Sequence, residues 1–129
     1  MSGQSREAIS TPNAPKAVGP YSQAIKANGF LFISGQVCFD PATGELVSGG
    51  VERQTEQVMK NLSAILQAAG SGWDKVVKTT VYLKNMSDFG KMNEVYGRFH
   101  SGAPPARSTV EVAKLPRDVS IEIDVIALC

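Results

Sequence analysis

Few residues of this 129-residue chain could carry chemistry, and two of them, Arg107 and Glu122, stand in predicted strands near its C-terminal end. Arg107 follows two prolines in the stretch PPARSTVEVAKLP, at the start of a β-branched segment. Its planar guanidinium fits a carboxylate at two points. Tyr21 and a few small polar residues complete the inventory. Binding of a small carboxylate is therefore one interpretation of Arg107.

The second interpretation is structural. The segments RSTVEVAKL and VSIEIDVIAL read as two strands, and the sequence PRD between them (residues 116–118) predicts a hairpin. In an antiparallel hairpin, Arg107 and Glu122 would both lie away from the turn and could meet in the same region of the sheet. A salt bridge between them would then only tie two strands together. The residues alone leave both interpretations open.

Other kinds of site are disfavoured by the residue types present. With one histidine, His100, and two separated cysteines, Cys38 and Cys129, we expect no metal site, no disulfide framework and no histidine-based hydrolase. We expect His100 at the end of a helix, where a cation suits the dipole, and both thiols free in a reducing compartment. The chain has no phosphate loop and no GxSxG elbow, and we expect no cofactor.

The charge balance bears on partners and location. A formal net charge of +1 argues against a basic face that grips nucleic acid. The most apolar run, VVKTTVYL, is short and interrupted, so we expect no membrane span. The N-terminus lacks the apolar centre of a secretory signal. A cytoplasmic protein is expected, with the mitochondrial matrix as the alternative.

The elements that must position these residues can be read along the chain as one domain spanning residues 1–129. Residues 1–15 contain prolines and small residues and predict an extended N-terminal arm. Residues 21–37 predict two short strands joined by a tight turn at Asn28 and Gly29. After a loop, apolar residues at steps of three and four predict a helix that Gly70 ends. This stripe comprises Val51, Thr55, Val58, Leu62, Ile65, Leu66 and Ala69.

The second half of the chain continues the alternation. Residues 75–84 predict a strand with Val77, Thr79, Val81 and Leu83 on one face. The next segment, NMSDFGKMNEVYGRFH, predicts a helix with Ser87 as its N-cap. In the last strand, strict alternation separates two faces. One carries Ile121, Ile123, Val125 and Ala127, and the other carries Ser120, Glu122, Asp124, Ile126 and Leu128.

The resulting order, β-β-α-β-α-β-β, predicts an α+β fold with a mixed sheet. Two helices can cover only one face of such a sheet. The uncovered face would carry Tyr82 and Thr80 with lysines, or Ile126 and Leu128 with acids. A semi-apolar face of this kind suits a subunit interface. A monomer whose sheet face meets water is the alternative.

Five segments, in order, carry a family resemblance. They are AVGPYSQAI, FISGQV, VVKTTVYLKNMSDFGKMNEVY, PPARSTVEVAKLP and IEIDVIA. Together they cover nearly the whole chain, which resembles the RidA family, also called the YjgF/YER057c/UK114 family.

The resemblance implies a chorismate-mutase-like fold and a homotrimer with active sites in clefts between subunits. It also implies a cofactor-independent hydrolase that converts 2-aminoacrylate, 2-iminopropanoate and 2-iminobutanoate into 2-keto acids and ammonia. These reactive enamines and imines are released by pyridoxal-phosphate enzymes.

The matching positions imply roles for individual residues. Arg107 would bind the substrate carboxylate, and Glu122 would act on the attacking water. Tyr21 would line the cleft, with Ser34 and Asn93 nearby. Thr109 stands where some members have cysteine, and its backbone is the expected contact. The ending IEID, where IEIE is common, changes Asp124 and leaves Glu122 in place.

Two rival functions remain. The first is a ribonuclease or translation inhibitor, which the lone histidine and the absence of a basic excess disfavour. The second is a non-catalytic binder of small carboxylates or a chaperone-like protein. Arg107 would serve such a binder as well, whereas Glu122 would be dispensable.

Overall fold

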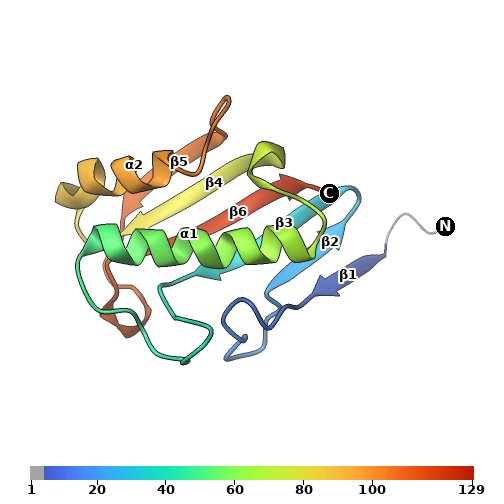
Figure 1. Ribbon diagram of the computed structural model, residues 1–129, viewed down its shortest axis with the longest axis horizontal. Coiled ribbons are helices and arrows are strands. Elements are labelled where there is room, and N and C mark those ends of the chain that lie inside the picture. Colours follow the sequence, from blue (N-terminus) through green and yellow to red (C-terminus); the bar gives the residue numbers. More distant parts are fainter. Residues whose placement is uncertain (1–4) are drawn as a thin grey trace.

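The computed structural model describes residues 5–129, in which a six-stranded sheet carries both α-helices on one face (Figure 1). The first four residues of the predicted arm lie outside the described residues. The longer elements are β1 (Arg6–Ile9), β2 (Ala24–Ala27), β3 (Phe30–Gln36), α1 (Val51–Ala68), β4 (Val76–Leu83), α2 (Phe89–Gly97), β5 (Ala106–Glu111) and β6 (Ile121–Leu128). No helix in this part of the chain has the length and apolarity to cross a membrane.

The strands follow the order β1-β2-β3-β6-β4-β5 across the sheet. All neighbours are antiparallel except β4 and β5, which are parallel. The helix α2 makes the crossover between these two parallel strands, as a βαβ connection requires. The predicted mixed sheet and α+β class are confirmed.

The predicted hairpin between the last two strands is wrong. β4 lies between β5 and β6, so the two strands are not neighbours. Residues Pro116–Asp118 form a short 3-10 turn in which Arg117 and Asp118 have φ of 55° and 57°. The prediction failed because the short connection suggested that β5 and β6 are neighbours, whereas β4 occupies the antiparallel position beside β6.

The N-terminal arm adds a strand that the sequence did not predict. Residues 6–9 pair with β2 at the edge of the sheet, although the segment was expected only to be extended. The amide of Gln23 ties the following loop down: the Thr11 N–H donates to Gln23 Oε1 (2.7 Å), and Gln23 Nε2 donates to the carbonyl of Pro15 (2.8 Å). The turn after β2 is confirmed, with φ of 56° at Asn28 and 84° at Gly29.

The hydrophobic core lies between the sheet and α1. The predicted apolar stripe of α1 is buried against it, and Gly70 follows the helix with φ of 76°, as expected. From the sheet, alternate residues point toward the helices and are fully buried. They are Leu31, Val81, Leu83, Ile121, Ile123, Val125 and Ala127.

Two local predictions are wrong. Val77 is exposed and Val76 is buried, because the pairing of β4 with β6 shifts register between Val76 and Lys78. Ser87 is not the N-cap of α2, because Met86–Asp88 already form a 3-10 turn and Asp88 takes that position without a side-chain hydrogen bond.

The opposite face of the sheet is uncovered in this chain, as predicted (Figure 1). Phe32 and Leu128 each remain 45% exposed there. The Tyr82 hydroxyl donates to Asp124 Oδ2 (3.1 Å) on the same face. Exposed aromatic and aliphatic side chains beside isolated acids fit a surface that another chain could cover.

Candidate active site

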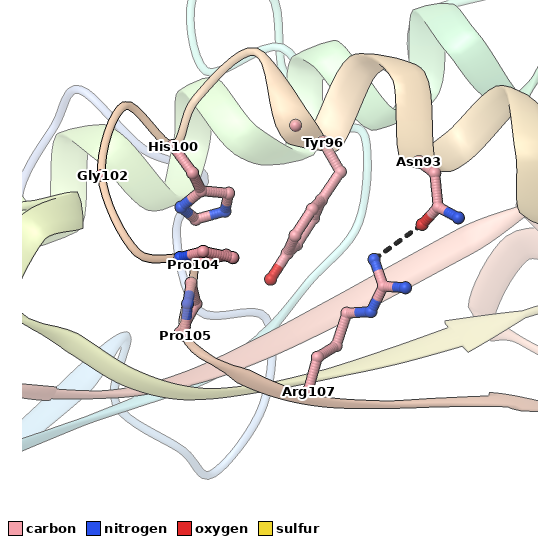
Figure 2. Close-up of a pocket in the computed structure, with 8 residues that line it drawn as sticks. Asn93, Tyr96, His100, Gly102, Pro104, Pro105 and Arg107 are labelled. Atoms are coloured by element: carbon pink, nitrogen blue, oxygen red, sulfur yellow. Dashed lines mark hydrogen bonds between the residues drawn. The ribbon is translucent and has the colours of Figure 1, made fainter.

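Arg107 projects from β5 toward α2 and is held there by three side chains of that helix. Its Nη1 donates to Asn93 Oδ1 (2.7 Å) (Figure 2). The guanidinium carbon lies 5.4 Å from the ring centre of Phe89 and 5.0 Å from that of Tyr96. The spacing of residues 89, 93 and 96 places all three on one face of the helix. Arg107 is therefore aimed by a hydrogen bond and two cation–π contacts.

Tyr96 is itself held in place by a residue of the sheet. Its hydroxyl shares a 2.7 Å hydrogen bond with Thr79 Oγ1 on β4, inside the protein. Burial raises the pKa of Tyr96, while the hydrogen bond from Thr79 and the charge of Arg107 lower it. Since the net shift is upward, the phenol stays protonated at neutral pH, and its ring offers Arg107 a neutral π face.

The ring of His100 packs against that of Tyr96 at a tilt, on the side away from Arg107 (Figure 2). The two ring centres are 4.6 Å apart, and Trp73 lies 5.1 Å from His100 edge-on. Burial, and then the charge of Arg107, lower the pKa of His100. The expected cation at the end of the helix is therefore wrong, because the imidazole is packed among rings and is neutral at neutral pH.

Thr109 lies on the same face of β5 as Arg107, two positions further along. Its Oγ1 is buried and has no hydrogen-bond partner among the described residues. The outer edge of β5 pairs with no strand within residues 5–129. The expectation that Thr109 acts through its backbone stays a prediction.

Glu122 occupies a different place, on the uncovered face of the sheet. With Tyr21 and Ser34 it lines a hollow of about 360 Å³. The Ser34 hydroxyl donates to the carbonyl of Ser22 (2.6 Å), and the Tyr21 hydroxyl accepts from the Val18 N–H (3.3 Å). These three predicted site residues are thus brought together by β3, β6 and the loop before β2.

The carboxylate of Glu122 is closely confined. Burial, and then the charge of Asp124, raise the pKa of Glu122. The backbone of Gly35 lies directly against it: a Cβ at position 35 would come within 2.9 Å of Glu122 Cδ. Only glycine leaves room for the carboxylate in this position. A base with a raised pKa is better matched to proton transfer near neutral pH.

The predicted site residues therefore form two groups. Arg107, Asn93 and Thr109 lie on the helix side of the sheet, and Glu122, Tyr21 and Ser34 gather on the other side. The proposed salt bridge between Arg107 and Glu122 is wrong within one chain, because Arg107 pairs with Thr79 and Glu122 with Tyr82, whose side chains alternate across β4.

Sequence reasoning missed Phe89, Tyr96, Thr79 and Gly35. The spacing of the first two around Asn93 on a predicted helix was a signal for Arg107's surroundings. The pairing of Thr79 with Arg107 depends on the parallel β4–β5 register and could not be read locally. Within residues 5–129, no cluster of three or more His, Cys, Asp or Glu side chains could hold a metal ion.

Comparisons with known proteins place the chain in a family. The family model described as Endoribonuclease L-PSP matches residues 11–129. The structure of YyfA from Yersinia pestis, a member of the conserved Rid protein family, superposes with a TM-score of 0.95 at 48% identity, covering 97% of this chain and all of that one. The chain belongs to the RidA family.

Two further proteins are also similar to this chain. The mouse protein named 2-iminobutanoate/2-iminopropanoate deaminase is 50% identical over 128 residues, which cover 99% of this chain and 95% of the mouse protein. The structure of Escherichia coli TdcF with bound serine has a TM-score of 0.91 at 40% identity, covering 95% and 98% of the two chains.

Proposed function

We propose that this RidA-family chain hydrolyses reactive enamines and imines to 2-keto acids and ammonia, without a cofactor, in sites formed between the subunits of a homotrimer. The substrates would be 2-aminoacrylate, 2-iminopropanoate, 2-iminobutanoate and their relatives. The mouse relative's name supports this class of reaction. Serine bound to TdcF supports an amino-acid-like ligand with a free carboxylate.

The observation that carries the proposal is the state of Arg107. It is half-buried and oriented by Asn93, Phe89 and Tyr96, yet it forms no ion pair with any described carboxylate. A fixed guanidinium that lacks an anionic partner is ready to receive one from a ligand. Because its position is set in advance, little side-chain entropy would be lost on binding.

The chemistry needs few groups. With the carboxylate held by Arg107, the imine carbon has a fixed position. Glu122 accepts a proton from a water molecule, whose oxygen bonds to the carbon of the protonated imine and gives a carbinolamine. Glu122 then returns this proton to the amine nitrogen, the C–N bond breaks, and ammonia leaves as the carbinolamine hydroxyl releases its proton to form the keto group. Such imines already hydrolyse in water, so the barrier to be lowered is small.

A homotrimer would resolve the separation of the two groups. Arg107 and Glu122 of one chain face opposite sides of its sheet, so one substrate cannot meet both. If the uncovered face of one chain packs beside β5 of the next, Glu122 of one subunit and Arg107 of another would border one cleft. Exposed Phe32, Val110 and Leu128 would be covered by such packing.

A coupled assay tests this function. A serine or threonine dehydratase generates 2-aminoacrylate or its four-carbon homologue, and keto-acid release is followed with and without the purified chain. We expect faster release in proportion to added protein. Release at the uncatalysed rate at every protein concentration would rule the deaminase out.

The description of the family model keeps a ribonuclease as a second candidate. A ribonuclease would need acid–base groups beside the phosphate, and the one histidine is neutral and packed between Tyr96 and Trp73. Incubating purified chain with RNA, beside the Arg107→Ala variant, separates the candidates. Cleavage by the parent that the variant loses would support the ribonuclease.

A further inference from the structure

A hollow of about 490 Å³ opens beside Arg107 on the helix side of the sheet. Figure 2 shows its organisation: Arg107 and Asn93 lie at one end, and His100, Pro104 and Pro105 lie at the other. The ring of Tyr96 stands between the two ends. We call this space the Arg107 hollow. Arg107, at the polar end of this hollow, is the residue to which the proposed function assigns the substrate carboxylate.

The far end of the Arg107 hollow is uncharged. Its walls are the proline rings and the imidazole of His100, whose pKa is lowered by burial and by Arg107. No acidic side chain is among the residues that line it. Gly97 and Gly102 also line it, and a Cβ added at either would meet no atom within 4 Å. The end away from Arg107 therefore carries no charged side chain and has free space. Its one buried polar atom without a hydrogen-bond partner among the described residues is His100 Nε2.

We propose that the Arg107 hollow is a side-chain subsite, which selects imino acids with large planar or branched apolar side chains over the smallest ones. This inference rests on the proposed function and specifies its substrate class. With the carboxylate on Arg107, a side chain directed toward His100 would lie between Tyr96 and the prolines. A methyl side chain would leave this space to water.

The surroundings favour a flat apolar group in particular. Tyr96 is locked by Thr79, and His100 is held between Tyr96 and Trp73, so both rings keep fixed orientations. Aromatic side chains in proteins gain from offset or edge-on contacts with fixed rings, beyond their burial of area. The volume is also in the range of small-molecule sites, well above what the smallest imino acid fills.

Binding of inert carboxylates tests the subsite apart from catalysis. Calorimetry on the full chain would compare 3-phenylpropanoate with propanoate, which share the carboxylate and differ by the ring. Partial burial of the ring should make 3-phenylpropanoate bind at least about tenfold more tightly. Equal affinities would overturn the subsite.

Variants whose side chains fill the Arg107 hollow provide a second test of the subsite. Gly97→Leu ends α2 with a better helix former and places a side chain in the free space. It should remove most of the preference for 3-phenylpropanoate, and Gly102→Leu should do the same from the loop. The control is Gly90→Leu, also on α2 with open space around its Cβ but outside the hollow, which should keep the preference. A preference that survives both filling variants would refute the subsite.

Turnover is then measured on the same proteins. An amino-acid oxidase supplies the imine of phenylalanine or of alanine, and we expect Gly97→Leu to lower the ratio of kcat/KM for the two imines by roughly tenfold. If both imines are hydrolysed equally and the ratio is unchanged, the subsite is wrong and the deaminase stands. If neither imine is hydrolysed, the deaminase is wrong, and the carboxylate preference still decides the subsite.

Discussion

The guanidinium of Arg107 and the carboxylate of Glu122 project from opposite faces of one sheet, from strands that flank β4 on either side. Thr79, opposite Arg107, is buried under α2, and Tyr82, opposite Glu122, lies on the uncovered face. An intramolecular salt bridge between the two residues is thereby excluded. Any site that uses both must combine two chains.

The first prediction is a mass of three chains. The semi-apolar uncovered face should be buried in the assembly, because its exposed Phe32 and Leu128 favour contact with another protein surface. Light scattering on purified protein should give three times the 13.7 kDa of one chain. A mass near that of a single chain at micromolar concentration would contradict both the trimer and the shared site.

The second prediction concerns mixed assemblies. Arg107→Ala and Glu122→Gln chains, each inactive alone, should recover activity when unfolded together and reassembled. In a cyclic trimer that contains both variants, one of the three clefts combines an intact Arg107 with an intact Glu122. Random assembly should therefore restore about a quarter of the parental activity. If the mixture stays inactive while the trimer forms, both residues do not serve one shared cleft.

The third prediction separates charge from shape at Arg107. Arg107→Lys keeps one positive charge and loses the planar two-point contact. A charge-assisted hydrogen bond contributes roughly 1.5–3 kcal/mol, so kcat/KM should fall about ten- to a hundredfold, and further in Arg107→Ala. Arg98→Lys, on an exposed arginine that pairs with Glu94 on the helix surface, is the control. An Arg107→Ala protein that keeps its activity and melts early would make the arginine structural.

The fourth prediction is a pH profile set by Glu122. Because burial and Asp124 raise the pKa of Glu122, activity should fall on acidification at a pH above the ordinary 4.5 of glutamate. Glu122→Gln should lose roughly a hundredfold or more of turnover and the acid limb with it. Asp124→Asn should move that limb to lower pH and keep most of the rate. A Glu122→Gln enzyme at the parental rate would support the carboxylate-binder alternative instead.

The raised pKa of Glu122 should also make the folding stability depend on pH. A carboxyl group with a raised pKa in the folded state favours folding below its unfolded pKa, and this contribution is lost as the pH rises through the folded value. The parent should therefore lose folding stability relative to Glu122→Gln as the pH rises from the unfolded pKa of Glu122 to its higher folded pKa. Parallel urea titrations of both proteins measure the difference.

The fifth prediction concerns the support under Arg107. Thr79→Val and Tyr96→Phe each leave the other's buried hydroxyl unpaired, which should cost about 1–3 kcal/mol of unfolding free energy. The double variant leaves no orphan, so its cost should be clearly smaller than the sum. Urea denaturation gives all three values, with Thr80→Val on the uncovered face as the control. Additive costs would show that the two hydroxyls are not coupled.

Local patterns in the sequence predicted much of this fold. The apolar stripe of α1, the tight turn at Asn28 and Gly29 and the alternation along β6 each have a physical cause within a few residues. The sequence did not predict which strand lies beside β5. Whether a strand pairs with the one before it or with another strand depends on which positions in the sheet are already occupied. β1 escaped notice because its partner β2 lies beyond a proline-rich loop.

The sequence likewise predicted only part of the candidate site. The family resemblance implied that Arg107, Glu122, Asn93, Tyr21 and Ser34 are site positions, and their chemical types agree with the proposed carboxylate substrate. Their separation into two groups depends on the parallel β4–β5 pairing, which a residue pattern does not encode. The role of Asn93 illustrates this: its amide is placed to orient Arg107, so it would act on the substrate through the arginine.

The close approach of Gly35 to Glu122 has an evolutionary consequence. A single-nucleotide change can turn glycine into alanine, and the added methyl group would force the carboxylate out of its place while α1, α2 and Arg107 stay as they are. In the proposed hydrolase, one substitution at Gly35 would thus give a protein that keeps Arg107 to bind small carboxylates and loses the turnover assigned to Glu122.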